Sequence, residues 1–182
     1  TSYLDRYFKV GDKIRLQKDG GLEYKNIKIT NINGSEMTLE RHVGNSDNGN
    51  YYTATIEREM PDLEYICESN MRLWGVKDNT IYASKYNDPF NFQVNEGIAS
   101  DSYYIDVGTE GKFTGCCQFS NYICFFKENT LHKLYGQKPS NFQVVTTPIA
   151  GVQAGCEKSL KIVNNMLIYK GVNGVYAYGG GN

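Results

Sequence analysis

The sequence predicts an all-β protein built from repeated antiparallel strand units, and three observations indicate this fold class. First, the 182 residues include 15 Tyr, 8 Phe and 19 Gly, and aromatic residues favour strands while glycines favour tight turns. Second, short segments of alternating apolar and polar residues are separated by turn residues. Third, one strand–turn–strand pattern recurs along the last two thirds of the chain.

The composition argues against several classes of function. The formal net charge is −1, so the chain has no basic excess to neutralise phosphates, and we expect no direct nucleic-acid binding. No apolar run reaches the length of about 18 residues that a transmembrane helix needs, so we expect no membrane insertion. The five cysteines are an odd number and match neither a disulfide framework nor the paired spacing of a zinc site. We therefore expect buried, reduced thiols.

Residues 1–60 are expected to form a run of short hairpins. The Asn33-Gly34 pair separates the alternating segments 27–32 and 37–40, which is the strongest short-range hairpin signal in a sequence. Phe8–Leu16 alternates in the same way around Gly11-Asp12. Further turns are expected at Asp19–Gly21 and Asp47–Asn50, followed by a strand over Tyr51–Ile56. Such closely spaced strands predict a small β-barrel module of the SH3-like or OB-like kind.

The pattern stops at Pro61-Asp62-Leu63, where we place the boundary with a second region, residues 61–182. This region repeats itself when the sequence is shifted by 50. Nine of 28 aligned residues are identical, where about two are expected by chance. The identical residues are Cys67 and Cys117, Lys77 and Lys127, Asn79-Thr80 and Asn129-Thr130, Pro89 and Pro139, and residues 91–94 and 141–144.

A shift of 44 reveals a third, weaker copy. It pairs Asn121 with Asn165, Ile123 with Leu167, Asn129 with Asn173 and Leu131 with Val175. The copies thus lie near residues 67–94, 117–144 and 161–178, and each consists of an apolar strand, a turn centred on Asn and a second strand. The predicted hairpins join 73–76 to 81–84, 122–126 to 131–134, and 166–169 to 175–178.

This interval matches the blades of a β-propeller, which hold about four strands each. The first strand of each pair is almost continuously apolar, as expected for a strand packed on both faces. A propeller needs at least about four blades, whereas the sequence shows two units and part of a third. Either the remaining blades lie outside this chain, or the units stack in another way.

The second region also resembles a known family. Arg72–Gly75, Asn79–Ser84 and Asp88–Phe92 are similar to an ordered block of motifs in tailed-bacteriophage virion proteins, the tail or packaged-DNA stabilisation proteins. The next block of that family resembles Phe113–Gly115, Phe125–Asn129, His132–Gly136, Pro139–Phe142, Glu157–Leu160 and Gly174–Tyr178. The resemblance covers about residues 56–179 and is weaker in the N-terminal hairpins.

The resemblance implies a propeller-like structural component of the tail or neck, located in the virion and assembled in the host cytoplasm. It implies partners among other virion proteins, in a homo- or hetero-oligomer, and no small-molecule substrate. It implies no catalytic, cofactor-binding or metal-binding residues, so none is assigned to this chain. Family members are longer than this chain, which leaves the completeness of the ring open.

The residues themselves offer a few candidates for chemistry, each with a structural alternative. His42 and His132 are the only histidines, so a nucleophilic mechanism has to use one of them. Cys124 and His132 are expected on neighbouring strands and so within reach of each other, but no orienting partner is evident. A zinc site would gather His132 with four of the cysteines, which lack paired ligand spacing. The four are Cys67, Cys116, Cys117 and Cys124.

Other polar and aromatic residues favour structural roles. Asp47–Asn50 resembles the start of a calcium loop but lacks the closing Glu, which favours a hairpin turn. Asp101, Asp106 and Glu110 flank a Gly-containing turn and are interpreted as a solvated edge. Trp74 is expected in the core, because apolar residues replace it in the other copies.

The Asn-Phe-Gln-Val segments that follow Pro89 and Pro139 are expected to end connections between units. In this interpretation Pro fixes the turn, Asn caps it and Phe enters the core. A sugar-binding role for the segments is the alternative.

The sequence therefore predicts a non-enzymatic virion structural protein that acts through assembly contacts. Tyr103, Tyr104, Tyr122 and Tyr135 are candidate interface anchors. The alternative is a host-surface module that binds glycan or protein. A third possibility, a glycoside hydrolase, requires two carboxylates across a cleft, and no acidic pair is singled out by its context.

Overall fold

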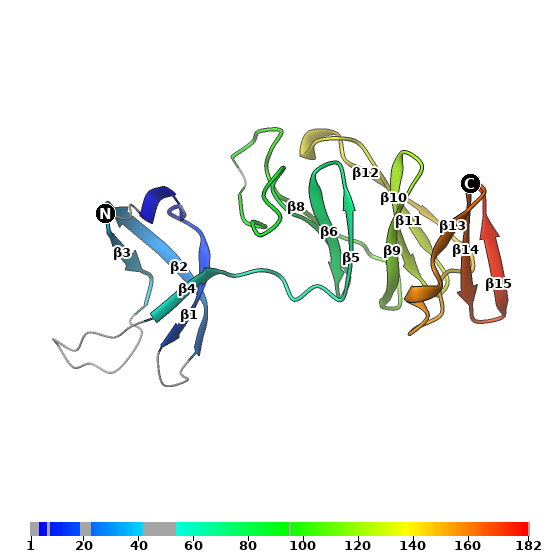
Figure 1. Cartoon of the computed structure of the whole chain (residues 1–182), viewed down its shortest axis with the longest axis horizontal. Coiled ribbons are helices and arrows are strands. Elements are labelled where there is room, and N and C mark those ends of the chain that lie inside the picture. Colours follow the sequence, from blue (N-terminus) through cyan, green and yellow to red (C-terminus); the bar gives the residue numbers. More distant parts are fainter. Residues whose placement is uncertain (1–3, 7, 19–22, 42–53, 95, 182) are drawn as a thin grey trace. The chain divides into compact units, whose positions relative to one another are not determined.

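The computed structural model describes residues 4–6, 8–18, 23–41, 54–94 and 96–181. Within these residues the secondary structure is all β apart from three single-turn 3-10 helices, which confirms the predicted fold class (Figure 1). The short helices are η1 (Leu4–Arg6), η2 (Pro139–Asn141) and η3 (Glu157–Ser159). The chain divides into two compact units, residues 1–60 and 61–182.

The first unit is a four-stranded antiparallel sheet in the order β3-β2-β1-β4, curved into a half-barrel. The long strand β2 pairs with β1 through its first part and with β3 through its second. Ile14, Ile27 and Ile29 have no exposed surface and form its core. The strands are β1 (Lys13–Lys18), β2 (Glu23–Asn33), β3 (Glu36–Leu39) and β4 (Ala54–Arg58).

The hairpin predicted at Asn33-Gly34 is confirmed. Asn33 pairs with Glu36, so Gly34 and Ser35 form the loop, and Gly34 has the left-handed φ of +61° that glycine adopts without strain. Phe8–Val10 were expected to alternate within a strand, but β1 begins only at Lys13. The turns expected at 19–21 and 47–50, and the start of the strand expected over 51–56, lie outside the described residues.

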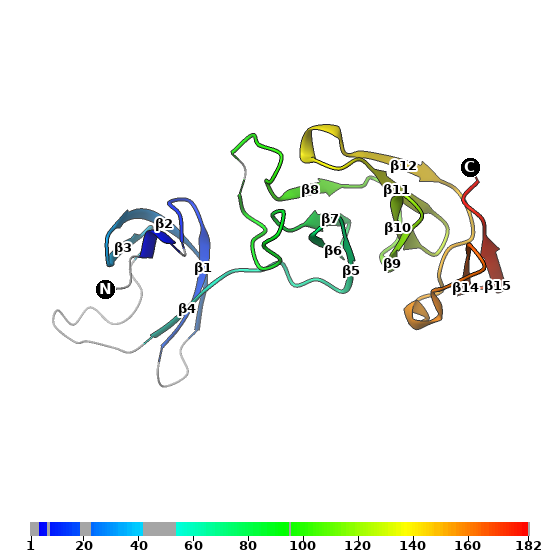
Figure 2. The ribbon, with the colours of Figure 1, turned by 45° about the horizontal axis from the view of Figure 1, so that its top comes forward.

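The second unit consists of three antiparallel sheets, and in each one every strand pairs with its neighbours in sequence (Figures 1 and 2). The first sheet contains β5 (Tyr65–Ser69), β6 (Arg72–Lys77), β7 (Thr80–Ala83) and β8 (Tyr103–Asp106). The second contains β9 (Phe113–Phe119), β10 (Tyr122–Lys127), β11 (Leu131–Tyr135) and β12 (Gln143–Thr147). The third contains β13 (Lys161–Val163), β14 (Met166–Gly171) and β15 (Gly174–Tyr178).

The sequence repeat is a structural repeat. All three predicted hairpins are present as β6–β7, β10–β11 and β14–β15. Leu73, Ile123 and Leu167, which the shifts of 50 and 44 bring together, are each the second residue of their strand. The shifts therefore align correctly the hairpin that recurs in every sheet.

The repeated Asn-Phe-Gln-Val segments correct one prediction. Residues 141–144 run from η2 into β12, whereas residues 91–94 lie in a longer connection before β8. Both connections join the third and fourth strands of one sheet, rather than successive units as expected. The same four residues thus lead directly into strand β12 in the second sheet, whereas in the first sheet they lie in a loop. More residues follow them in the first sheet before strand β8 begins.

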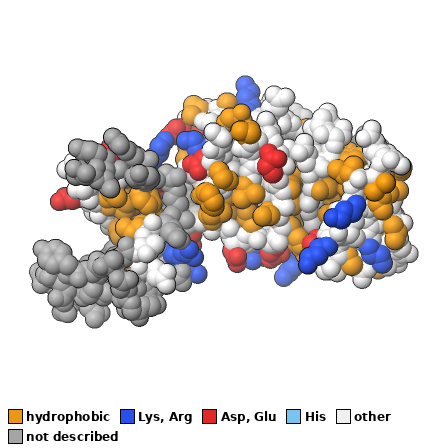
Figure 3. Space-filling model, in the orientation of Figure 1, with side chains coloured by type: hydrophobic (Ala, Val, Ile, Leu, Met, Phe, Trp, Pro, Cys, Tyr) orange, Lys and Arg blue, Asp and Glu red, His pale blue; other side chains and the backbone are white. Residues whose placement is uncertain are grey.

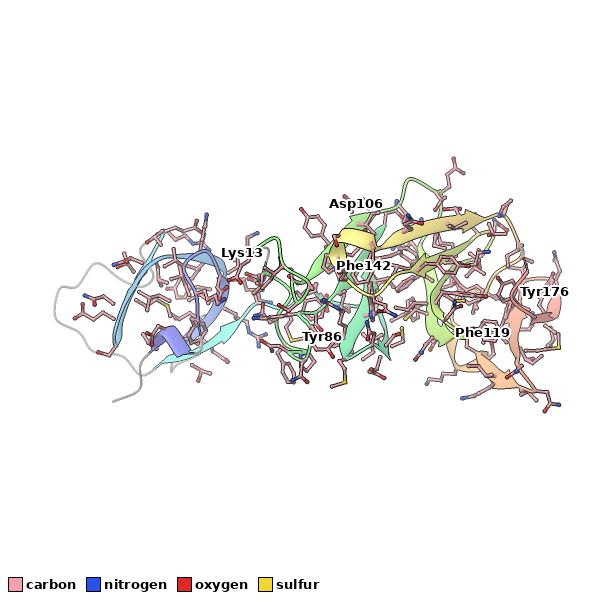
Figure 4. All side chains as sticks on the ribbon, turned by 90° about the horizontal axis from the view of Figure 1, so that it is seen from above. Lys13, Tyr86, Asp106, Phe119, Phe142 and Tyr176 are labelled. Atoms are coloured by element: carbon pink, nitrogen blue, oxygen red, sulfur yellow. The ribbon has the colours of Figure 1, made fainter. Side chains whose placement is uncertain are left out.

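One core lies between the first and second sheets. Trp74 and Val76 of β6 pack there with Ile123 and Phe125 of β10. The ring centroids of Trp74 and Phe125 are 6.3 Å apart. Phe142, which β12 follows, lies edge-on to Trp74 at 5.1 Å, and Figure 4 shows it among the side chains of the first sheet.

A second core lies on the opposite face of the second sheet. Cys124 and Phe126 of β10 pack there with Leu167 and Tyr169 of β14, and the rings of Phe126 and Tyr169 are 5.0 Å apart. All residues of β10 are consequently buried, as predicted for a strand packed on both faces. In β14 only alternate residues are buried, so the third sheet is covered on one face.

Among the described residues, no helix has the length and apolar character that crossing a membrane requires.

We expect Phe125→Ala to lower the free energy of unfolding by about 3–5 kcal/mol, because it empties the centre of the first core. The matched control is Phe90→Ala, whose side chain is 67% exposed and whose loss should change stability by less than about 0.5 kcal/mol. Urea titration followed by tryptophan fluorescence measures both. Equal effects of the two substitutions would contradict this packing.

Candidate functional site

One candidate site is a cavity of about 690 Å³ at one end of the second and third sheets. Two turns at repeat-equivalent positions contribute to its lining, with Ser120 and Asn121 between β9 and β10 and Asn165 between β13 and β14. Phe119, Tyr122 and Tyr135 supply aromatic surface. Figure 4 shows Phe119, from β9, in this part of the unit together with Tyr176 of the third sheet.

The aromatic side chains of the cavity are held by one another. The rings of Tyr122 and Tyr135 are 4.9 Å apart, and Phe119 lies edge-on to Tyr122 at 6.0 Å. The Tyr122 hydroxyl donates to the Tyr178 hydroxyl at 3.3 Å, and the Tyr178 hydroxyl donates to the Gly181 carbonyl at 2.9 Å. Burial and the bond to Tyr178 raise the pKa of Tyr122 above its ordinary value, so its phenol is neutral at physiological pH.

The chemistry of this cavity suits the binding of a ligand. Its described lining consists of aromatic, amide, hydroxyl, aliphatic and glycine groups, with no Cys, His, Asp, Glu, Lys or Arg. Aromatic rings beside amides can bind an uncharged polar ligand, because the rings contact its apolar surface and the amides form hydrogen bonds with its polar groups. Tyr122 and Tyr135 were predicted as interface anchors, whereas Phe119, Asn121 and Asn165 were not predicted as site residues. The repeat that aligns Asn121 with Asn165 was the available signal for the two turns.

A smaller cavity of 280 Å³ is lined by charged groups, including Glu110, Lys112 and Glu128. The Glu128 carboxylate is already used, since it accepts a hydrogen bond from the Ala154 backbone N–H at 3.1 Å. Glu110 is exposed. This hydrogen bond anchors the segment that contains Ala154 to the turn between β10 and β11.

The pair Cys124 and His132, which the sequence left open as a catalytic dyad, is not brought together. The strands are neighbours, but His132 stands opposite Phe125, and Cys124 stands opposite Lys133. Because directly opposite residues share a face and successive residues alternate, the thiol and the imidazole lie on opposite faces of the sheet. Cys124 packs in the second core, and His132 lies edge-on to Phe113 of the first.

His132 is buried with no exposed surface. Its Nε2 lies 2.9 Å from the hydroxyl of Thr109, and its Nδ1 lies 2.9 Å from the hydroxyl of Thr146. A neutral imidazole donates to one hydroxyl and accepts from the other. Burial, with a smaller contribution from Lys127, lowers the pKa of His132 from 6.5 to about 4, so the ring is neutral at pH 7.

The five cysteines are free thiols; Cys124 is buried and the others are half-buried. A hydrogen bond with Cys116 and burial raise the pKa of Cys67, and a hydrogen bond with Cys117 and burial raise that of Cys124. Neither thiol is therefore poised to ionise as a nucleophile. Among the described residues, no three Cys, His, Asp or Glu side chains are arranged to hold a metal ion. His42 and Asp47–Asn50 lie outside the described residues.

The acidic residues interpreted as a solvated edge have different environments. Asp101 is only 2% exposed, so that interpretation is wrong for it. Its Oδ2 accepts hydrogen bonds from the backbone N–H groups of residues 96, 97 and 98. Asp106 and Glu110 are exposed, as expected, and Asp106 accepts a hydrogen bond from the Thr80 hydroxyl.

Two buried cations hold the backbone in place. Arg72 is 1% exposed and donates to the carbonyl oxygens of Ser84, Ala99 and Asp101. Lys127 is also 1% exposed; its ammonium donates to the Asn79 Oδ1 and to the Thr109 carbonyl, both at 2.7 Å. Arg72 thus fixes the long connection before β8, and Lys127 ties the second sheet to the β6–β7 turn of the first.

The remaining candidates are mostly structural. Trp74 is 2% exposed and belongs to the core, as predicted. Asn141 caps its turn by accepting hydrogen bonds from the backbone N–H groups of Gln137 and Lys138. Of the four tyrosines proposed as interface anchors, only Tyr104 is exposed, at 67%; Tyr103 and Tyr135 are half-buried and Tyr122 is buried.

Comparison with models of protein families and with curated proteins finds no match to this chain.

We expect the free energy of unfolding to fall as the pH decreases from 6.5 to 4, because the imidazole of the unfolded chain binds a proton in this window and that of folded His132 does not. Below about 4 both states bind the proton and the contribution levels off. Its size should be about 3 kcal/mol, because each unit of the change in the His132 pKa from 6.5 to about 4 is worth about 1.4 kcal/mol.

Urea titrations of the wild type and of His132→Asn across this range isolate the effect, since the variant lacks the titrating group. The imidazole pKa can also be measured directly by NMR. A pKa for His132 close to 6.5 would contradict the buried environment described above.

Proposed function

We propose that this chain is a structural component of a phage virion, in the tail or neck, that acts through assembly contacts. The observation that carries the proposal is that residues of the motifs that resemble the virion family have structural roles. Arg72 and Ser84 are buried and bind backbone groups, and Trp74 fills the core between two sheets. Lys127, in the next block, ties one sheet to another. These roles suit a scaffold whose work is to hold a shape.

The proposal includes the finer fold assignment. We assign residues 61–182 to a propeller-like arrangement and residues 1–60 to a small SH3-like or OB-like barrel module. Sheets of sequence-adjacent antiparallel strands that pack face to face along the chain support the first assignment. The half-barrel of four curved strands supports the second.

Immunogold electron microscopy tests the virion assignment. Antibodies raised against the purified chain should label the tail or neck of phage particles prepared from the host that carries this sequence. Labelling should be lost when the antibody is first absorbed with the chain. Particles that remain unlabelled after mild disruption, while an antibody to the capsid labels them, would contradict the proposal.

A host-surface binding module is the second candidate, and the 690 Å³ cavity is the observation that favours it. Ring faces of Phe119 and Tyr135 beside the amides of Asn121 and Asn165 are groups that recognise sugars. A glycan would stack on a ring and exchange hydrogen bonds with the amides.

An array of bacterial surface glycans tests this candidate. If a glycan binds in the cavity, Tyr135→Ala should weaken binding at least about tenfold, or about 1.4 kcal/mol. Tyr104→Ala is the matched control, since this tyrosine belongs to the first sheet and does not line the cavity. Equal binding by both variants, or no binding to any glycan, would remove the second candidate.

A further inference from the structure

The repeat shows what normally covers each sheet. Ile81, Leu131 and Val175 occupy equivalent positions in the three sheets. Ile81 and Leu131 have no exposed surface, because the next sheet of the chain packs on them, whereas Val175 is 73% exposed. The third sheet therefore has the face that binds a following sheet, and within the described residues that face is open.

This open face, here called the last face, carries apolar side chains together with two lysines, since Lys170 pairs with Val175 and Lys161 pairs with Ile168. Directly paired residues share a face, so Ile168 shares it with Ala177, and Met166 shares it with Val163. Met166 is 40% exposed and Val163 is 52% exposed. Hydrophobic side chains are visible at this end of the unit in Figure 3. A sheet that faces water on one side normally carries polar residues there.

The first sheet has the complementary face, here called the first face. In the second and third sheets the face toward the preceding sheet carries Ile123 and Leu167, which are 4% and 0% exposed. The equivalent face of the first sheet carries Leu73, which is half-buried, with Ile66 and Tyr104, which are 60% and 67% exposed. At its centre Gly75 stands where the second sheet has Phe125, and the chain's own Leu63 fills that place, since a Cβ at Gly75 would lie 2.7 Å from Leu63 Cδ1. Leu63 thereby adds to the apolar surface of this face.

A polar contact of the internal interface can be repeated between these two faces. Lys127 donates to Asn79 across the first and second sheets. The repeat places Lys77 at the position of Lys127 in the first sheet, and Asn173 at the position of Asn79 in the third. Lys77 is held only at the surface, 3.2 Å from Glu64 and 3.9 Å from Asp62, and such exposed ion pairs are easily exchanged.

We propose that the last face of one copy binds the first face of a second copy, with Lys77 of one donating to Asn173 of the other. This rests on the proposed assembly role and names its partner. The occupant is a second copy because the first face carries apolar side chains and, at the position of Lys127, the lysine that the interface between the first and second sheets uses. Two such head-to-tail contacts close a ring of six sheets, three from each copy, within the range of about four to eight blades of propellers.

Light scattering coupled to size exclusion, over a wide range of concentrations, tests the proposal on the full chain. The wild type should reach twice the 20.6 kDa of one chain. Val175→Glu on the last face and Ile66→Glu on the first face should each raise the dissociation constant at least about tenfold, since each would bury a carboxylate in the contact. Lys170, which stands opposite residue 175, offsets only part of that cost. Val145→Glu, at an exposed valine of β12 in the second sheet, is the matched control and should have no effect.

Mixing the variants distinguishes the head-to-tail arrangement. The Val175→Glu chain keeps an intact first face and the Ile66→Glu chain keeps an intact last face, so an equimolar mixture should associate more tightly than either chain alone. Asn173→Asp should tighten association several-fold through the charge on Lys77. The same substitution in a Lys77→Met background should lose this gain.

Three results would overturn the inference. The first is a chain that remains a monomer throughout, because the faces would then be covered by another segment or another protein. The second is a dimer that survives Ile66→Glu but not Val175→Glu, because that dimer would join two last faces. The third is a dimer that survives both substitutions. None of these results decides the virion assignment, which the immunogold labelling tests independently of self-association.

Discussion

The second unit depends on one physical constraint, which is that a sheet with two apolar faces must be covered on both. The middle sheet meets this constraint within the chain. Strand β10 places Ile123 and Phe125 in one core and Cys124 and Phe126 in the other, so every residue of the strand is buried. Because strand side chains alternate between faces, the first and third sheets become the two walls of these cores.

The same burial accounts for the structural roles of the buried polar side chains in this unit. Polar groups taken out of water need hydrogen-bond partners. Accordingly His132 is neutral between two threonine hydroxyls, and Arg72 donates to backbone carbonyls. Groups held in this way stabilise a shape and are poorly placed to exchange protons with a substrate. The larger cavity, with its aromatic and amide lining, lies instead at one end of two neighbouring sheets.

The three sheets differ where their surroundings differ. The position of Lys127, whose ammonium reaches Asn79 of the preceding sheet, is occupied in the third sheet by Gly171. A Cβ at Gly171 would lie 2.8 Å from the Gly151 carbonyl oxygen, so the closer approach of the chain there excludes a side chain. The two interfaces between sheets thus share an apolar core but differ in their polar contacts and in how closely the backbones approach.

The sequence by itself determined the fold class and the register of the repeat. Strand periodicity, turn residues and shifts of 50 and 44 are local or self-referential signals, and they were sufficient to align Leu73, Ile123 and Leu167. Only the tertiary structure decided which face each side chain occupies relative to its neighbours. It separated Cys124 from His132, buried Asp101, and opened the cavity beside Asn121 and Asn165. These outcomes depend on cross-strand register and on contacts between sheets, and neither leaves a periodic signal in a single sequence.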